Sequence, residues 1–250
     1  MELERLAAVV RPRAAWEAID LGFSMARLWW LDIMRPWLVL TLPLFVGLNW
    51  LLLDYLWLVP LLFWWFKPWF ERIPLYVASR ALFGDTPSMR QTLTACPGLL
   101  VHRSIAAVTW SRISLTRSFY LPLWQLEKLS GQAYRDRASI LAPKSHSDAM
   151  WLTIICIHFE TLLIACVTLF VFLMIPDSLY EFDPVDVISG LPVAFQLLIN
   201  IAYYSAITLL EPFYVCAGFS LYLNRRTSLE AWDIELAFRR LRKRLQAERI

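Results

Sequence analysis

The chain of 250 residues is 58% apolar and only 18% charged, and its net charge at neutral pH is +3. A soluble domain is typically about half apolar and a quarter charged, so this composition argues against an ordinary soluble enzyme and points to lipid as the solvent. The small net charge, with basic residues spread among apolar ones, also argues against nucleic-acid binding. We therefore expect an all-α integral membrane protein, because helices satisfy their own backbone hydrogen bonds inside a bilayer.

Residues 1–36 predict an amphipathic N-terminal helix on the cytoplasmic side of the membrane. Trp16, Ile19 and Phe23 recur at helical spacing, which is typical of a helix with one apolar face. Two interpretations of this helix remain open. It is either an interfacial helix that leads the chain into the bilayer, or a specific site for anionic lipid headgroups.

Residues 37–70 predict a transmembrane hairpin. Asp54 lies in the middle of this long apolar run, and a carboxylate at the centre of a membrane helix costs about 3 kcal/mol. We therefore place Asp54 at a tight turn between helices of about 36–53 and 55–70. Whether the second helix crosses the bilayer or forms a short re-entrant hairpin stays open, and Lys67 is expected to snorkel to the interface.

Residues 71–149 predict a cytoplasmic or interfacial segment of several short amphipathic helices. Pro97-Gly98 and Leu121-Pro122-Leu123 are expected to interrupt these helices, because proline lacks a backbone donor. At the end of the segment, Ser147 or Asp148 is expected to cap the next membrane helix. Apolar side chains alternate with arginines throughout, so we expect the helices to lie against the membrane surface.

Residues 150–222 predict the third and fourth transmembrane helices. Two apolar runs in this part each exceed the roughly 20 residues that cross a bilayer. Between them, the loop of residues 176–189 carries acidic residues and no Lys or Arg. This loop is expected to lie outside.

The distribution of basic residues fixes the predicted orientation. Lys and Arg are confined to residues 1–36, 67–150 and 218–250, which together hold all 24. With an even number of passes in residues 37–70, every basic residue lies on one side, which the positive-inside rule assigns to the cytoplasm. We therefore expect four membrane segments in a bacterial inner (plasma) membrane, with both termini cytoplasmic.

Residues 223–250 predict a cytoplasmic C-terminal amphipathic helix. Thr227 and Glu230 have the spacing of a capping box, in which each side chain bonds a backbone N–H of the helix start. An apolar stripe farther along this helix predicts a partner. The candidate surface for a partner or a lipid headgroup consists of Arg11, Arg13, Arg225, Arg226, Glu230, Trp232 and Asp233.

Three ionisable residues within the predicted spans form a candidate intramembrane polar site. They are His158 and Glu160 in the third span and Glu211 in the fourth. Counting 1.5 Å per residue from the cytoplasmic ends places both carboxylates roughly 10–14 Å deep. The site is either functional, for a proton, a cation or a lipid headgroup, or structural, as polar glue between helices.

No motif in the sequence predicts catalysis. There is no nucleophile elbow, no zinc-protease motif and no phosphate-binding glycine loop. The four cysteines are scattered, without the spacing of a disulfide framework or a zinc site. We expect no catalytic residue, no metal ligand and no cofactor.

Several stretches resemble a family of bacterial inner-membrane proteins without an assigned activity. They are residues 11–23, WWFKP at 64–68, SRALFG at 79–84, LPLWQLE at 121–127, EPFY at 211–214, YLNRR at 222–226 and LEAWDIE at 229–235. Such proteins look like neighbours of MoxR-type AAA+ ATPases and transglutaminase-like membrane proteins. The tail also faintly resembles the membrane domain attached to some glycerophosphodiesterases. The resemblance implies an accessory subunit rather than a catalyst.

The leading functional expectation is a non-enzymatic inner-membrane scaffold or accessory subunit. Its cytoplasmic helices would dock a partner, such as another membrane protein or a complex that contains an AAA+ ATPase. The alternative is a small transporter or lipid-handling protein that uses Glu160 and Glu211. The two differ in whether these carboxylates face each other or a cavity, or instead pair with arginines.

Overall fold

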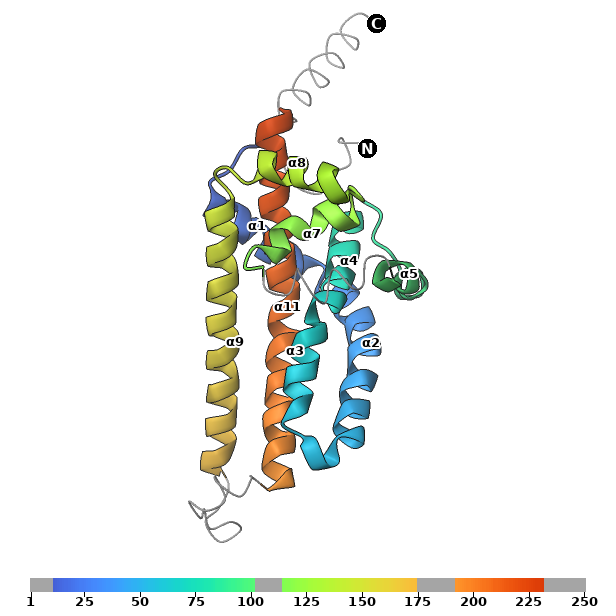
Figure 1. Ribbon diagram of the computed structural model, residues 1–250, viewed down its shortest axis with the longest axis vertical. Helices are drawn as coiled ribbons and strands as arrows, with labels where there is room; N and C mark the ends of the chain where they lie inside the picture. The colour runs from blue at the N-terminus through green and yellow to red at the C-terminus, as the bar shows by residue number, and fades with distance from the viewer. Residues whose placement is uncertain (1–10, 102–113, 175–191, 232–250) are drawn as a thin grey trace, which may run out of the picture.

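The computed structural model describes residues 11–101, 114–174 and 192–231, and its regular elements in these ranges are helices (Figure 1). The predicted outer loop 176–189, most of the C-terminal helix, Trp232 and Asp233 lie outside the described residues. The helices are α1 Ala15–Leu28, α2 Trp30–Leu51, α3 Leu58–Phe70, α4 Arg72–Leu82, α5 Met89–Val101, α7 Arg117–Gln125, α8 Gly131–Leu141, α9 His146–Met174 and α11 Val193–Glu230.

Helices α2, α3, α9 and α11 stand side by side, and the shorter helices α1, α4, α5, α7 and α8 gather around one end of them (Figure 1). We call these five helices the helical cap. Three of the described helices, α2, α9 and α11, are long and apolar enough to cross a membrane. α3 has only 13 residues and falls short of that length, so a fourth crossing is not established by length.

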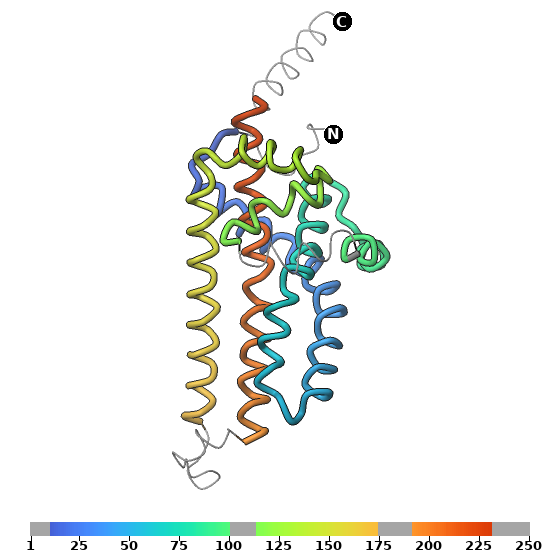
Figure 2. The backbone as a smooth tube through the Cα atoms, in the orientation of Figure 1, coloured from blue at the N-terminus to red at the C-terminus, as the bar shows by residue number. Residues whose placement is uncertain are grey.

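The turn predicted at Asp54 is confirmed. A 3₁₀ turn at Leu53–Tyr55 separates α2 from α3, and the chain reverses direction there (Figure 2). Asp54 is exposed at the tip of this hairpin. The expected helix bounds were slightly wrong, because α2 already begins at Trp30 and continues directly from α1.

Large apolar side chains are exposed along the long helices. On α9 they include Phe159, Leu162, Phe170 and Leu173, and on α2 they include Trp50. Exposed apolar area of this extent is typical of a surface that meets lipid or another protein. It agrees with the lengths of the three candidate spans.

The helix α11 is the centre of the fold. Its 38 residues make it about 57 Å long at 1.5 Å per residue, which is about twice the thickness of a bilayer's hydrocarbon core. One part packs against α2 and α9, and another part packs inside the helical cap against α1, α4 and α7. A single helix therefore connects the apolar bundle to the cap.

A ladder of side-chain hydrogen bonds joins α2 to α11. Trp37 Nε1 donates to Thr208 Oγ1 at 3.3 Å, the hydroxyls of Thr41 and Tyr204 lie 2.9 Å apart, and Asn200 Nδ2 donates to Asn49 Oδ1 at 2.8 Å. The contacts are four and eight residues apart along α2 and four residues apart along α11, in opposite directions. They fix the register of two antiparallel helices whose apolar side chains alone would permit sliding.

Helix α1 packs on α11 through small residues. Its buried face consists of Ala18, Ile19, Gly22, Met25 and Ala26, while Trp16, which was expected on the apolar face, is 53% exposed. The two helices approach so closely that a Cβ on Gly22 would lie 2.4 Å from the Cα of Ala217. Only glycine permits this contact.

Two predicted interruptions of helices were wrong. α5 continues through Pro97 and Gly98 to Val101, and α7 continues through Pro122 to Gln125. Pro97 lies four residues before the end of α5 at Val101, so only the last turn of the helix follows it. Pro122 lies near the end of a helix of nine residues, where few later turns depend on its geometry.

Two predicted helix starts were also wrong. α9 begins at His146, ahead of Ser147 and Asp148, which therefore lie in its first turn. The capping box at Thr227 does not start a new helix, since α11 runs on to Glu230 and the Thr227 hydroxyl donates to the Leu223 carbonyl. The spacing of a capping box thus occurs here inside a continuing helix.

We expect Gly22→Ala to lower the free energy of unfolding by about 1–3 kcal/mol, because the added methyl group collides with the backbone of α11. Gly47→Ala is the matched control. A Cβ there would meet nothing within 4 Å, so the change should be neutral or stabilise α2 by about 0.5–1 kcal/mol. Thermal unfolding of both variants in detergent checks this, and equal midpoints would contradict the close contact.

Candidate functional site

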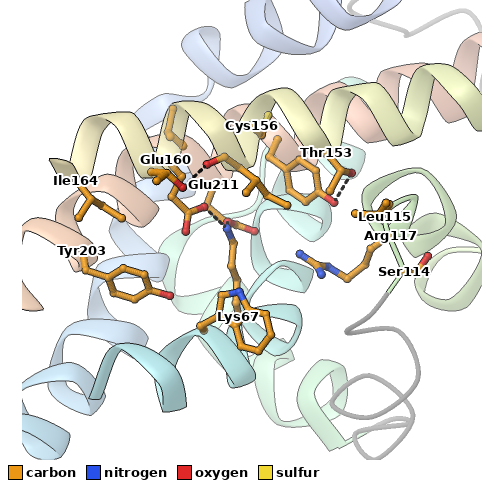
Figure 3. Close-up of a pocket in the computed structure, with 15 residues that line it drawn as sticks. Lys67, Ser114, Leu115, Arg117, Thr153, Cys156, Glu160, Ile164, Tyr203 and Glu211 are labelled. Atoms are coloured by element: carbon orange, nitrogen blue, oxygen red, sulfur yellow. Dashed lines mark hydrogen bonds and ion pairs between the residues drawn. The ribbon is translucent and has the colours of Figure 1, made fainter. Parts of the chain in front are cut away.

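A cavity of about 510 Å³ lies between α3, α9, α11 and the start of α7 (Figure 3). Four of its lining side chains are charged, namely Lys67, Arg117, Glu160 and Glu211. The lining also includes Trp64 and Ile157, which are 40% and 48% exposed, so the cavity reaches the surface between α3 and α9. α9 packs on α11 and α7 without an extensive contact to α3.

The ammonium of Lys67 lies between the two carboxylates that the sequence singled out. Its Nζ donates a hydrogen bond to Glu160 Oε2 at 2.7 Å and lies 3.1 Å from Glu211 Oε2. The three side chains come from α3, α9 and α11 and converge at one point (Figure 3). The ion contacts therefore tie three helices together.

Part of the predicted polar site is brought together and part is not. Glu160 and Glu211 share one cation, but His158 is exposed and its Nδ1 lies 2.7 Å from the carbonyl oxygen of Ile154 on its own helix. Two residues along an α-helix correspond to a rotation of about 200°. His158 therefore faces away from Glu160, and its assignment to the site was wrong.

The expectation for Lys67 was also wrong. This side chain does not snorkel outward but is buried, with 8% of its surface exposed. The reason is electrostatic, because two carboxylates inside the bundle need a cation and Lys67 is within reach of both. The signal was present in the sequence, where one lysine interrupts a run of aromatic residues.

A second buried ion pair lies beside the first. Arg117 of α7 donates from Nε to Glu71 Oε2 at 2.6 Å, and its Nη2 contacts Glu71 Oε1. Glu71 is fully buried at the end of α3. Burial alone would lower the pKa of Arg117, but the adjacent Glu71 carboxylate more than offsets it and raises the pKa above its ordinary value. The guanidinium therefore stays charged.

Arg117 also connects to the remaining wall of the cavity. Its guanidinium lies over the ring of Tyr214, 5.7 Å from the centroid, and the Tyr214 hydroxyl is 3.1 Å from Thr153 Oγ1. The contacts run from α7 through α11 to α9. Neither Glu71 nor Arg117 was predicted as a site residue, since neither lies in an apolar run.

Buried charges of both signs gather at this place. Glu71, Glu160 and Glu211 supply three carboxylates, and Lys67 and Arg117 supply cations within ion-pair distance of them. Arg72, which is buried and follows Glu71 in the chain, is a further cation that interacts electrostatically with Glu71. Among the described residues, no group of three or more His, Cys, Asp or Glu is arranged to hold a metal ion.

Most of the predicted docking residues are engaged within the chain. Arg226 pairs with Glu230, which also pairs with Arg137 of α8. Arg225 donates to the carbonyl of Leu141, so these side chains fasten α8 to α11, two helices that are in contact.

The N-terminal part of that surface behaves similarly. The backbone N–H of Arg13 donates to Asn224 Oδ1 at 2.8 Å, and Asn224 Nδ2 donates back to the Arg13 carbonyl at 2.9 Å. Arg11 pairs with Glu17 at an exposed position. Of the described docking residues, Arg11 therefore presents its side chain most openly.

We expect Lys67→Met to lower the free energy of unfolding by about 3–5 kcal/mol, because it leaves two buried carboxylates without their cation. Adding Glu160→Gln and Glu211→Gln to the same chain should recover most of that loss, since the charges are then removed together. Thermal unfolding in detergent checks both variants. A triple variant that is no more stable than Lys67→Met would contradict the electrostatic account.

Comparison with known proteins assigns no family to this chain. No protein-family model matches it, and no curated protein or solved structure matches it significantly.

Proposed function

We propose that this chain is an integral protein of a bacterial inner membrane that binds the headgroup of a membrane lipid in the cavity between α3 and α9. The observation that carries the proposal is that Lys67, Glu160 and Glu211 line a cavity of about 510 Å³ that opens through the side of the bundle. Charged groups at the bottom of such an opening fit an amphiphile, whose head is polar and whose tail remains in lipid.

The proposed topology has four membrane segments, α2, α3, α9 and α11, with both termini cytoplasmic. The hairpin turn at Leu53–Tyr55 supports an even number of passes before the basic segment that follows it. The three candidate spans support crossing by α2, α9 and α11. In this arrangement the helical cap is cytoplasmic and carries basic residues, in agreement with the positive-inside rule.

The depth of the charged groups fits the inner leaflet. Glu160 is 14 residues before the end of α9, which is roughly 21 Å along the helix, and Glu211 is 18 residues after the start of α11, roughly 27 Å. In a hydrocarbon core of about 30 Å, both carboxylates then lie near the cytoplasmic boundary. The lipid headgroups of that leaflet lie just beyond this boundary.

The cavity supports lipid handling better than a scaffold role. Arg13, Arg225, Arg226 and Glu230 were expected to dock a partner, but each is engaged within the chain. Docking by this surface would have to break the ion pairs that hold α8 on α11. By contrast, Glu160 and Glu211 line a cavity and share one cation, Lys67. In the described part of the chain, neither pairs with an arginine of the predicted docking surface.

A lipid that carries a photoreactive diazirine in its acyl chain tests the proposal in full-length protein in nanodiscs. We expect crosslinks to the walls of the cavity on α3 and α9, in addition to those on the outer faces of all lipid-exposed helices. Thr161→Trp, at an exposed lining position, should reduce the cavity crosslinks severalfold by filling the opening.

Leu162→Trp is the matched control, since Leu162 is the neighbouring residue, is 59% exposed and does not line the cavity. It should leave the cavity crosslinks unchanged. If the walls of the cavity are never labelled above the level of the outer helix faces, lipid does not occupy the cavity and the proposal fails.

A further inference from the structure

We propose that the headgroup bound in this cavity carries a primary ammonium, as in phosphatidylethanolamine. This inference rests on the lipid-binding function proposed above and specifies the chemistry of the ligand. The carboxylates of Glu160 and Glu211 receive the ammonium. The cations Lys67 and Arg117, which line the same cavity, face the phosphate next to it.

The chain itself places an ammonium at this point. Lys67 Nζ lies 2.7 Å from Glu160 Oε2 and 3.1 Å from Glu211 Oε2, so the two carboxylates are spaced to hold a group of this size. Only the first of these contacts has hydrogen-bond geometry. The Lys67 ammonium thus donates a hydrogen bond to Glu160 but not to Glu211.

Glu211 is the group that lacks donors. It is 1% exposed, and neither of its carboxylate oxygens receives a hydrogen bond. An ionised carboxylate offers about four acceptor sites, and leaving them empty in a buried place costs free energy. Because Glu211 lines the cavity, a ligand with N–H donors can reach it there.

The two ends of a zwitterionic headgroup match the two signs of charge in the lining. Glu71 is paired with Arg117, and Glu160 and Glu211 share the single charge of Lys67. The ammonium of the headgroup would face the carboxylates and its phosphate would face the guanidinium or the lysine, so the bound headgroup leaves the net charge of the cavity unchanged. An anionic headgroup without an amine would offer no donor to Glu211.

A quaternary ammonium fits less well. It has no N–H group to donate to Glu211, and its recognition in proteins usually depends on a cage of aromatic faces. Of the three described aromatic residues that line the cavity, Trp64, Tyr203 and Tyr214, Tyr214 already has the Arg117 guanidinium over its ring, and Trp64 is 40% exposed at the opening. The lining therefore discriminates by hydrogen bonding and favours ethanolamine over choline.

The size of the cavity accommodates such a headgroup together with the start of its chains. Its volume of about 510 Å³ lies within the roughly 300–1,000 Å³ of small-molecule sites. Leu210 and Ile164 form apolar parts of the wall, next to the carboxylates on the same two helices. The acyl chains would leave between α3 and α9.

Two diazirine lipids with identical acyl chains, one with ethanolamine and one with choline, test the inference on full-length protein in nanodiscs. We expect about tenfold more cavity crosslinking from the ethanolamine lipid, equivalent to roughly 1.4 kcal/mol in affinity. Glu211→Gln should reduce that preference to near unity. Asp54→Asn removes an exposed carboxylate at the hairpin tip and should leave the preference intact.

A second measurement does not depend on the folding of the Glu211 variant. In Lys67→Ala, millimolar methylammonium should raise the thermal unfolding midpoint, because it replaces the missing ammonium, and tetramethylammonium should not. Equal effects of the two ions, or none, would overturn an ammonium site.

The outcomes separate this inference from the function on which it rests. Equal cavity crosslinking by the two lipids overturns the ammonium preference and leaves lipid binding in place. Absence of cavity crosslinks with both lipids overturns lipid binding itself. If free ethanolamine at equal concentration displaces the lipid completely, the ligand is a soluble amine, and the lipid assignment is wrong.

Discussion

The constraint on which this structure depends is that charge buried among apolar helices must be compensated within the protein. Five ionisable side chains lie at the junction between the long helices and the helical cap, and they come from the end of α3, from α7, α9 and α11. Each isolated charge would cost several kcal/mol. Their mutual contacts therefore fix where these segments meet, while apolar packing fills the space around them.

The long helix α11 transmits this constraint through the molecule. Below the charge cluster, its hydrogen bonds to α2 set the register of the apolar helices. Above the cluster, small residues admit α1 on one side, and a Cβ on Gly218 would collide with Ser118 of α7 on another. α9, in contrast, is held along α11 but not along α3. The cavity lies where α9 has no extensive contact with α3.

The sequence was sufficient for features that depend on local chemistry. Asp54 predicted the hairpin turn because a carboxylate inside an apolar run is costly, and the lengths of the runs predicted the long helices. Glu160 and Glu211 were placed at similar depth by counting residues along their helices, and the structure brings both to Lys67. Features that depend on distant pairs were missed or wrong. Lys67 was placed outward because its carboxylate partners are 93 residues away or more, and Thr227 satisfied a local capping pattern that the continuing helix overrides.

The amide pair between Arg13 and Asn224 has a consequence for biosynthesis. These residues are 211 positions apart, so α1, although made first, cannot dock until nearly the whole chain has left the ribosome. At about 5–20 residues per second, that interval is roughly 10–40 s. During it the small-residue face of α1 lacks its partner on α11. Docking of α1 is therefore a late step in the assembly of the cap, and it requires that α11 has been made.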